Sequence, residues 1–304
     1  MVEEENSLEK EYPLVSIAII TYNQKEYLRE CIESCLAQDY PNFEIVVADD
    51  CSTDGTQDLL REYETKYPGK FVLRLAEKNQ GITPNSNAAH FACSGKYIAW
   101  MGGDDLMLPG KLSKQVSYME ENPECTICYH NLDVFDSDTN KTLSFFNEKR
   151  KLNGDVRTSI RESTFNGACS NLVRAEKAPK HGFNKSLPVA SDWLYWVETL
   201  GNGGTINYID EVLGRYRRHA NNITRGEDFV TQNELDHLMS CQIIMAKFPE
   251  YFSDAVYVYS KRLLGLRHKV NYLPCLWKSI WLRPSIKAIA ALGIYLITFG
   301  KVKL

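Results

Sequence analysis

The chain has 304 residues, of which 44% are hydrophobic and 24% are charged, and its 35 Lys and Arg against 39 Asp and Glu give a net charge of −4. This composition is typical of a folded globular protein and excludes disordered, collagen-like and low-complexity chains. The charge is uneven, because residues 261–304 hold nine Lys and Arg and no Asp or Glu, which leaves the other 260 residues at −13. The acidic body argues against a nucleic-acid partner, and the basic tail predicts contact with an anionic surface.

The nine cysteines, an odd number, lie in segments that resemble ordinary core, and the chain opens on an acidic run at 3–5 instead of a basic, apolar signal. These features predict reduced cysteines and a cytoplasmic protein. Cys125 and Cys128 have the spacing of half a zinc site, but no second pair completes it. Because the segment alternates like a strand, we interpret both as structural residues.

Short apolar, β-branched runs alternate with segments of helical spacing along the first half of the chain. The patterns predict strands at 14–20, 43–48, 71–75, 96–101 and 126–135, helices at 27–36, 54–66 and 192–200, a loop entering a helix at 79–94, and a polar excursion at 136–151. This alternation predicts an α/β fold with a Rossmann-like, mixed, mostly parallel sheet and helices on both faces. Ligands are then expected at the carboxyl ends of the strands.

The segment 285–300 is apolar, yet only 13 uncharged residues separate Lys287 from Lys301. A helix needs about 20 apolar residues to span a bilayer, so this segment is too short to cross. With Trp277, Trp281 and the basic residues nearby, it is typical of a helix that lies on a membrane surface. A buried C-terminal helix or a partner interface is the alternative.

Polar residues follow the first two predicted strands. Tyr22 and Asn23 come after the first strand, and Asp49 and Asp50 come after the second. A carboxylate and an aromatic ring at adjacent strand ends can accept hydrogen bonds from a base and stack on its face, which suits a nucleotide. Turn and helix-cap chemistry is the alternative explanation for the acidic residues.

A second acidic pair, Asp104 and Asp105, follows a strand and two glycines. Adjacent carboxylates repel, and a hard divalent cation between them and an anionic ligand relieves that repulsion. The pair therefore predicts Mg²⁺ or Mn²⁺ bridging a diphosphate, although an ordinary acidic loop is the alternative.

Two common nucleotide-binding classes lack support in this sequence. Neither G-x-G-x-x-G nor G-x-x-x-x-G-K-[ST] occurs among the 18 glycines, which argues against a dehydrogenase and a P-loop NTPase. A nucleotidyltransferase would usually show a glycine-rich, basic phosphate loop near the N-terminus, and that loop is also missing from the sequence.

Five motifs in this order carry a resemblance to a known family: VSIAIITYN, VVADDCSTDGT, NQGITPNSNAAHFACSGKYI, GGDDLMLP and GFNKSLPVASDWLYWVETL. Together they resemble the family 2 inverting glycosyltransferases of the GT-A fold over residues 13–225. The resemblance implies a catalytic domain at 1–225, followed by a helical C-terminal region at 226–304 with the basic, apolar membrane-surface segment.

The resemblance implies a role for each residue of the nucleotide-sugar site. Tyr22 would stack on uracil and Asp50 would hydrogen-bond its edge, with Asn23 and Asn87 also in the nucleotide-sugar site. Where an Arg commonly precedes Asn87 in the family, this chain has Ser86, which leaves the diphosphate contacts open.

The resemblance also implies a metal site and a cationic group for the leaving diphosphate. Asp104 would lie at the ribose or in the metal shell, and Asp105 would bind the ion. In the run 215–219, Arg218 is expected to contact the nucleotide sugar and His219 the metal, although a solvated basic loop is the alternative. Gly102 stands where many relatives have the first Asp of D-x-D.

The catalytic base implied by the resemblance is Asp192, ahead of a tryptophan-bearing helix. An ionised carboxylate there would take the proton of an acceptor hydroxyl as its oxygen attacks the anomeric carbon. Asp192 could also serve as a helix N-cap. Ser191 replaces the usual Glu before it, which leaves acceptor or sugar recognition open.

These inferences predict a metal-dependent, inverting transferase that moves a hexose or N-acetylhexosamine from a UDP-sugar to a saccharide acceptor. By family analogy the acceptor is expected to be undecaprenyl-diphosphate-linked, in O-antigen, capsule or exopolysaccharide assembly at the inner face of the cell membrane. A non-catalytic module that binds a nucleotide sugar or a membrane surface is the alternative from another functional class.

Overall fold

The computed structural model describes residues 12–220, 222, 227–268 and 271–303. Its strands are β1 Val15–Thr21, β2 Phe43–Asp49, β3 Phe71–Leu75, β4 Tyr97–Gly102, β5 Leu106–Met107, β6 Cys125–Asp136, β7 Thr142–Phe145, β8 Leu172–Arg174 and β9 Thr205–Arg218. Its α-helices are α1 Lys25–Leu36, α2 Thr56–Lys66, α3 Ile82–His90, α4 Lys111–Glu121, α5 Val156–Glu162, α6 Asp192–Gly201, α7 Glu227–Lys247, α8 Phe252–Leu266, α9 Tyr272–Leu282 and α10 Ile286–Ile297. These bounds confirm each predicted strand and the three predicted helices to within a few residues.

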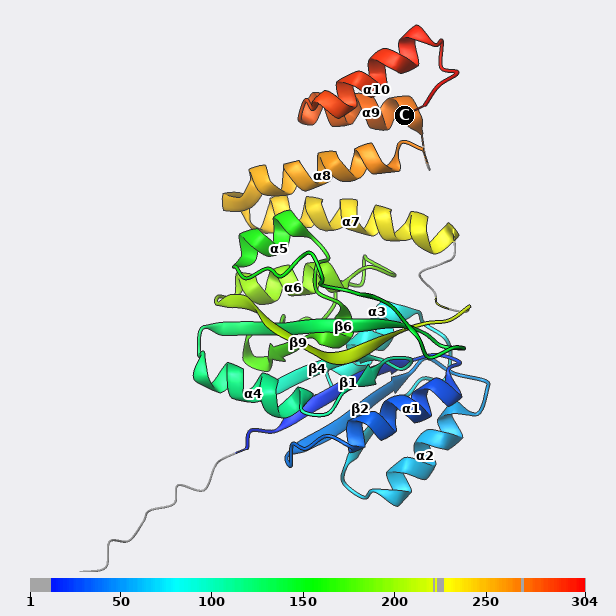
Figure 1. The fold of residues 1–304 in the computed structure, drawn as a ribbon, viewed down its shortest axis with the longest axis vertical. Coiled ribbons are helices and arrows are strands. Elements are labelled where there is room, and N and C mark those ends of the chain that lie inside the picture. The colour runs from blue at the N-terminus through cyan, green and yellow to red at the C-terminus, as the bar shows by residue number, and fades with distance from the viewer. Residues whose placement is uncertain (1–11, 221, 223–226, 269–270, 304) are drawn as a thin grey trace, which may run out of the picture.

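The strands form one mixed sheet in the order β3-β2-β1-β4-β8-β6-β9-β5, with β7 paired to β6. The four strands β3, β2, β1 and β4 pair in parallel, β6 and β9 also run parallel, and β8 is antiparallel to both of its neighbours. Helices α1 and α2 lie on one side of the sheet, and α3 and α6 lie on the other (Figure 1). The sheet buries apolar side chains on both faces, which explains why its parallel strands appear in the sequence as continuous apolar runs.

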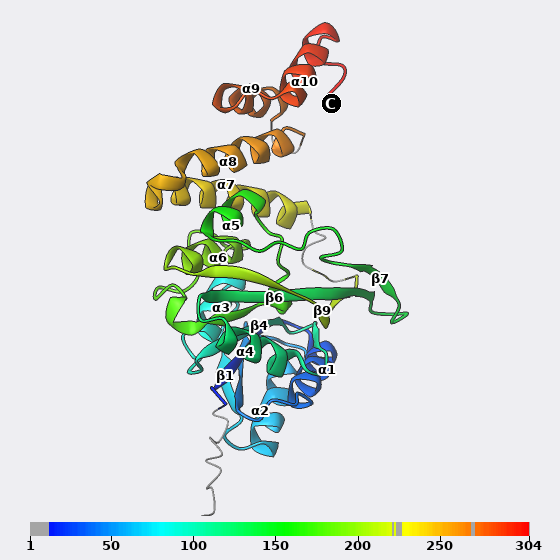
Figure 2. The same cartoon turned by 60° about the vertical axis from the view of Figure 1, so that its left-hand side comes forward.

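The polar excursion predicted at 136–151 contains the strand β7, which forms a hairpin with β6 and projects from the body (Figure 2). Leu143 is 57% exposed on this hairpin and Phe145 is 42% exposed. Sequence reasoning also missed β9, although it is the longest strand described, because its residues mix polar and apolar types without a clear period.

The C-terminal helices stack outward from the sheet in the order α6, α7, α8 and then the pair α9 and α10 (Figure 1). Residues of α7 and α8 such as Ile244 and Val258 belong to the same buried core as Trp193 of α6. Helices α9 and α10 form a separate small cluster around Leu276 and Ala291. The domain boundary predicted at 225 lies outside the described residues and stays a prediction.

Candidate functional site

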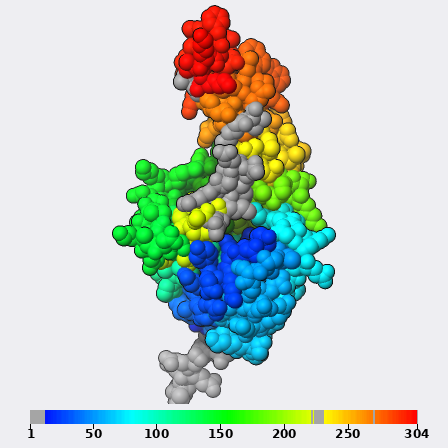
Figure 3. Space-filling view, turned by 90° about the vertical axis from the view of Figure 1, so that its right-hand side faces the viewer, coloured from blue at the N-terminus to red at the C-terminus, as the bar shows by residue number. Residues whose placement is uncertain are grey.

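The candidate site lies where the neighbouring strands β2, β1 and β4 end. Tyr22 follows β1, Asp50 follows β2, and Asp104 follows β4, so three segments far apart in the sequence meet at one edge of the sheet. Figure 3 looks onto this edge, with residues near the start of the described chain in blue below the yellow-green end of β9. This is the edge at which α/β sheets bind their ligands.

The two residues predicted to hold a base differ in how much of them is free for a ligand. Tyr22 is 47% exposed, so its ring is open to stacking. Asp50 is only 4% exposed, and its carboxylate accepts hydrogen bonds from the backbone amides of Gln80 at 2.7 Å and Gly81 at 2.7 Å. Asp50 therefore fixes the loop at 80–81, and any bond to a base uses the remaining lone pairs of the same oxygens.

Asn23 and Asn87 use their side chains to join loops of the protein itself. Asn23 has a positive φ of 51°, and its Oδ1 accepts a hydrogen bond from the Thr53 amide at 2.8 Å. Asn87 is buried, and its Nδ2 donates to the Phe183 carbonyl at 2.9 Å while its Oδ1 accepts from the Phe183 amide at 2.7 Å. Both residues thus shape the surroundings of the site through loop contacts.

The acidic pair divides into an accessible and a buried carboxylate. Asp104 retains 19% side-chain exposure, and its Oδ2 lies 3.1 Å from Nε2 of His219 and 3.2 Å from Nδ2 of Asn222. Asp105 is 3% exposed, and its Oδ1 accepts a hydrogen bond from the Arg217 amide at 3.0 Å. Burial, and then repulsion from Asp104, raises the pKa of Asp105 well above its usual range.

The side chains of Asp104 and His219 fit a divalent ion whose remaining ligands come from a diphosphate. A carboxylate oxygen and an imidazole nitrogen lie 3.1 Å apart; the carboxylate suits Mn²⁺ and Mg²⁺, and imidazole is a common ligand of transition-metal ions. No group of three or more His, Cys, Asp and Glu side chains that could hold a metal occurs in the described part of the chain. Mg²⁺ is commonly held by one or two protein carboxylates plus substrate phosphates, so the single carboxylate of Asp104 beside a diphosphate agrees with that pattern.

Gly102 leaves room for the Asp104 side chain. A Cβ at position 102 would lie 2.8 Å from Oδ1 of Asp104 and 3.2 Å from Oδ2 of Asp105. An aspartate at this position would therefore crowd both carboxylates as they stand here. The observed position of the Asp104 side chain therefore depends on a glycine at 102.

Within the basic run 215–219, Arg217 is the residue that bonds to the acidic pair Asp104 and Asp105. Sequence reasoning did not single it out. Its Nε donates to the Asp104 carbonyl at 2.7 Å and its Nη2 pairs with Oε2 of Glu30 at 2.6 Å. The guanidinium of Arg218 lies over the ring of Tyr216, 4.8 Å from its centroid. Since side chains alternate along a strand, a strand prediction for 215–219 would have placed Arg217 and His219 on one face.

Asp192, the predicted base, is the first residue of α6 and is partly exposed. Its Oδ1 accepts a hydrogen bond from the Trp193 amide at 2.8 Å. Ser191 is the N-cap residue and has no side-chain cap bond, so the alternative that Asp192 serves as the N-cap is wrong.

A short series of contacts connects the loop held by Asp50 to the predicted base Asp192. The loop that Asp50 fixes leads directly into α3, whose first turn contains Thr83. Oγ1 of Thr83 lies 2.8 Å from Oγ of Ser191 and donates to the Leu187 carbonyl at 2.5 Å. The structure thus links the loop at 80–81, which Asp50 holds, to the residue before Asp192 through the buried hydroxyls of Thr83 and Ser191.

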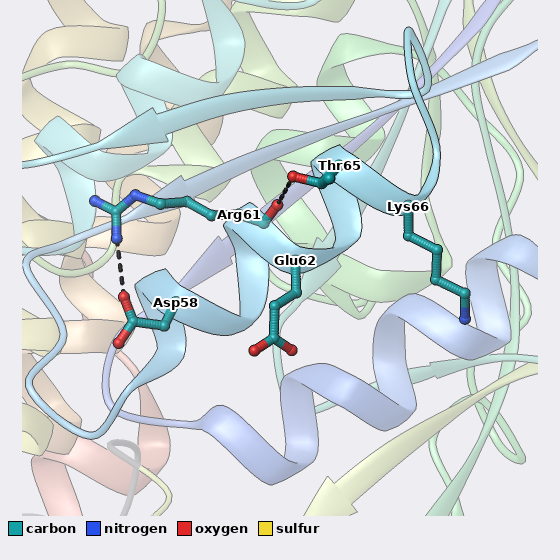
Figure 4. Close-up of a pocket in the computed structure, with 5 residues that line it drawn as sticks. All are labelled: Asp58, Arg61, Glu62, Thr65 and Lys66. Carbon is teal, nitrogen blue, oxygen red and sulfur yellow. Dashed lines mark hydrogen bonds and ion pairs between the residues drawn. The ribbon is translucent and has the colours of Figure 1, made fainter.

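A hollow on helix α2 lies apart from this edge and has a different character. Asp58, Arg61, Glu62, Thr65 and Lys66 line it, and all five come from the one helix (Figure 4). Arg61 pairs with Asp58 at 3.1 Å, and both side chains are more than half exposed. Helix-surface charges of this kind are screened and solvated, so we do not assign the hollow a ligand.

The family model for glycosyl transferase family 2 matches residues 16–178, which include Tyr22, Asp50, Asn87, Asp104 and Asp105. The chain belongs to glycosyltransferase family 2. The resemblance drawn from the five motifs is thereby confirmed. Asp192, Arg218 and His219 lie beyond the matched segment.

Relatives from several organisms share this family. The uncharacterised protein Rv1520 of Mycobacterium tuberculosis is 35% identical over 214 residues, which are 69% of this chain and 60% of Rv1520. The putative teichuronic acid biosynthesis glycosyltransferase TuaG of Bacillus subtilis is 28% identical over 70% of this chain and 82% of its own length. This chain therefore spans less than two thirds of the length of its mycobacterial relative.

Solved structures of low sequence identity share the fold. Residues 1–349 of S. aureus TarS in complex with UDP-GlcNAc match with a TM-score of 0.66 and 18% identity, over 95% of this chain and 88% of that one. The mannosyltransferase PcManGT from Pyrobaculum calidifontis in complex with GDP-Man and Mn²⁺ matches with a TM-score of 0.64 and 16% identity, over 95% of this chain and 81% of that one. The GT-A-type α/β fold predicted from the sequence is confirmed.

Proposed function

We propose that the protein is a glycosyltransferase that moves a hexose or an N-acetylhexosamine from a UDP-sugar to a hydroxyl of a saccharide acceptor. The observation that supports it most is the meeting of an open aromatic ring, Tyr22, with the Asp104 and His219 pair at one sheet edge. The complex of TarS with UDP-GlcNAc agrees with a UDP-linked donor, whereas PcManGT holds a GDP-linked one.

The proposed binding mode assigns one contact to each part of the donor. Tyr22 stacks on the base, and the carboxylate of Asp50 accepts from the N–H of its edge. Asp104 and His219 would hold a divalent ion, Mn²⁺ or Mg²⁺, which would neutralise the charge of the diphosphate. This assignment puts Asp104 ahead of the predicted ligand Asp105, because the Asp104 side chain retains 19% exposure whereas Oδ1 of Asp105 already accepts a hydrogen bond from the Arg217 amide.

The proposed chemical step needs one base on the face of the sugar opposite the diphosphate. Asp192 accepts the proton of the acceptor hydroxyl while that oxygen forms its bond to the anomeric carbon and the bond to the diphosphate oxygen breaks. A single displacement inverts the anomeric centre, so an α-linked donor gives a β-linked product. Arg218, whose guanidinium lies over Tyr216, is the proposed cation beside the leaving diphosphate.

The experiment that tests this function measures release of the nucleoside diphosphate in Mn²⁺ and in EDTA: UDP from a panel of UDP-sugars, and GDP from GDP-mannose. We expect metal-dependent turnover of one donor. Asp192→Asn should lower that turnover at least about a thousandfold and leave UDP affinity within about twofold, because the amide cannot accept the proton. Metal-dependent UDP binding without turnover of any donor in either protein would favour the non-catalytic binding module, whereas equal, measurable turnover in both proteins would contradict the role of Asp192 as the base.

We further propose that the C-terminal helices bind an anionic membrane surface. The weakly polar side of α10 packs on α9, where Ala291 is buried and Tyr295 stacks on Tyr272 at 5.0 Å. The pair of helices leaves large apolar side chains exposed, among them Trp281 of α9 at 78%, Ile297 of α10 at 78% and Phe299, just after α10, at 92%. An apolar face among basic residues is the pattern of an interfacial helix.

None of the helices in the described ranges has the length and apolarity to cross a bilayer. Surface attachment would bring the site to a lipid-linked acceptor, for which we propose undecaprenyl-diphosphate-linked saccharide at the inner face of the cell membrane. The teichuronic acid role in the name of TuaG agrees with assembly of a surface polysaccharide such as O-antigen, capsule or exopolysaccharide.

Vesicle flotation tests the membrane proposal without any knowledge of the acceptor. The double variant Trp281→Glu, Ile297→Glu should lose binding to phosphatidylglycerol vesicles, since both side chains are exposed and their loss leaves the packing of α9 and α10 intact. Phe252→Glu, at a 54% exposed position on α8, is the control and should bind as the wild type does. Equal binding of the double variant would contradict the proposal.

A further inference from the structure

The loop at 187–191, which leads into Asp192, is held from two sides. From α3, Oγ1 of Thr83 donates to the Leu187 carbonyl at 2.5 Å. From α7, one carboxylate oxygen of Asp236 accepts hydrogen bonds from the backbone amides of Val189 at 2.8 Å and Ala190 at 2.9 Å. The second contact crosses 46 positions of sequence and comes from a helix that lies outside the matched family segment 16–178.

Asp236 is buried, and further hydrogen bonds fix it within α7. Its side chain is 2% exposed, its second carboxylate oxygen accepts from Nε2 of Gln232 at 2.7 Å, and its carbonyl accepts from Oγ of Ser240 at 2.8 Å. A buried carboxylate is costly unless hydrogen bonds compensate it, and bonds to a charged acceptor are shorter and stronger than neutral ones. Both carboxylate oxygens of Asp236 are therefore used in hydrogen bonds, one to the loop and one to its own helix.

The next residue of α7, His237, packs against the first turn of α6. Its ring stacks on that of Trp193, with 5.4 Å between the centroids and 21° between the planes. Its Nδ1 lies 2.6 Å from the Asn233 carbonyl, and its Nε2 is buried with no hydrogen-bond partner among the described residues. Trp193 in turn donates from Nε1 to the Ser159 carbonyl at 2.9 Å, so its ring is fixed at both ends.

We propose that Asp236 and His237 are positioning residues for Asp192, and that α7 sets the reach of the base toward the acceptor. Asp236 fixes the backbone two and three residues before Asp192, and His237 fixes the ring of the residue after it. The carboxylate of Asp192 thus depends on a C-terminal helix for its place. This inference rests on the proposed function of Asp192 as the base.

Activity tests the proposal through a split between chemistry and donor binding. Because a shift of about 1 Å in a reacting group can cost about a hundredfold in rate, Asp236→Ala should lower kcat for UDP release at least about tenfold, with UDP affinity within about twofold of the wild type. Asp236→Asn keeps an acceptor oxygen and should recover most of the rate. In an Asp192→Asn background, Asp236→Ala should cause no further loss, since it acts through the base.

Lys247→Ala is the matched control, because Lys247 joins the other end of α7 to α6 by pairing with Glu198 at 2.8 Å and has no contact with the loop. It should lower stability without the loss in kcat. A parallel fall of UDP affinity and kcat in Asp236→Ala, or an equal fall in the Asp192→Asn background, would overturn the proposal.

A second readout does not need turnover at all. Hydrogen exchange measured by mass spectrometry should show faster exchange of the 187–193 amides in Asp236→Ala and in Asp236→Asn, by at least about tenfold in the former, with the Lys247→Ala control unchanged there. Unchanged exchange would overturn the positioning role even if Asp192 is the base. Faster exchange together with full activity of Asp192→Asn would instead locate the failure in the proposed function.

Discussion

His130 should make the protein lose stability as the pH falls below about 6.5. The side chain is 0% exposed on β6, its Nδ1 lies 2.7 Å from the Asn131 carbonyl, and its Nε2 has no partner in the described part of the chain. Burial first, and then the positive charge of buried Lys111, lowers the pKa of His130 well below its usual range, with the Asn131 carbonyl opposing. The folded protein therefore keeps this imidazole neutral in acid.

The sign and size of the effect follow from proton linkage. Above about pH 6.5 both the folded and the unfolded states carry a neutral His130, so its contribution is complete there. Below that pH His130 is protonated in the unfolded state but stays neutral in the folded state, so the free energy of unfolding falls. With an unfolded pKa of about 6.5, the loss between pH 7.0 and 5.5 is about 1.3 kcal/mol for this one residue.

Urea unfolding of wild type and His130→Leu at pH 7.0, 6.5, 6.0 and 5.5 measures the difference. The variant should lose about 1.3 kcal/mol less than the wild type over this range, whatever its stability at pH 7.0. His130→Gln provides a second non-titrating variant, and His268→Gln, at an exposed position, is the control that should follow the wild type. Parallel curves for wild type and both His130 variants would refute the reasoning.

Three further variants test the site and its supports. Tyr22→Ala should weaken UDP and the UDP-sugar donor alike, by about 1–3 kcal/mol in calorimetry, and a loss confined to the sugar would contradict base stacking. Asp104→Asn should abolish the Mn²⁺-dependent part of UDP affinity, whereas an equal loss in EDTA would count against a metal role. Gly182→Ala should lower the free energy of unfolding by about 2–3 kcal/mol, because φ is +72° and the new Cβ would lie 2.1 Å from Oδ1 of Asn87. Gly69→Ala, with φ of +76° and no heavy atom within 4 Å, is its control and should cost only about 1 kcal/mol.

Much of the fold could be predicted because its first half obeys simple periodicities. The run at 14–20 became β1, and the helical spacing after Tyr27 became α1, since parallel strands covered on both faces must be apolar throughout and amphipathic helices must bury one side. The family motifs likewise depend on short local stretches, so Tyr22, Asp50 and Asp104 could be recognised without coordinates. Strand β9 escaped because its exposed and buried residues follow no clear period.

The sequence by itself determined the residue types, the strand ends on which they stand and the family to which the chain belongs. Only the tertiary structure decided which carboxylate faces outward: Asp104 and Asp105 are adjacent and chemically identical, and the Arg217 amide from distant β9 makes Asp105 the buried one. The same holds for Asp236, whose proposed positioning role depends on its hydrogen bonds with two amides 46 and 47 positions away. Local propensity acts within a few residues, whereas burial and hydrogen bonding across the fold depend on every element that packs nearby, and no local pattern records them.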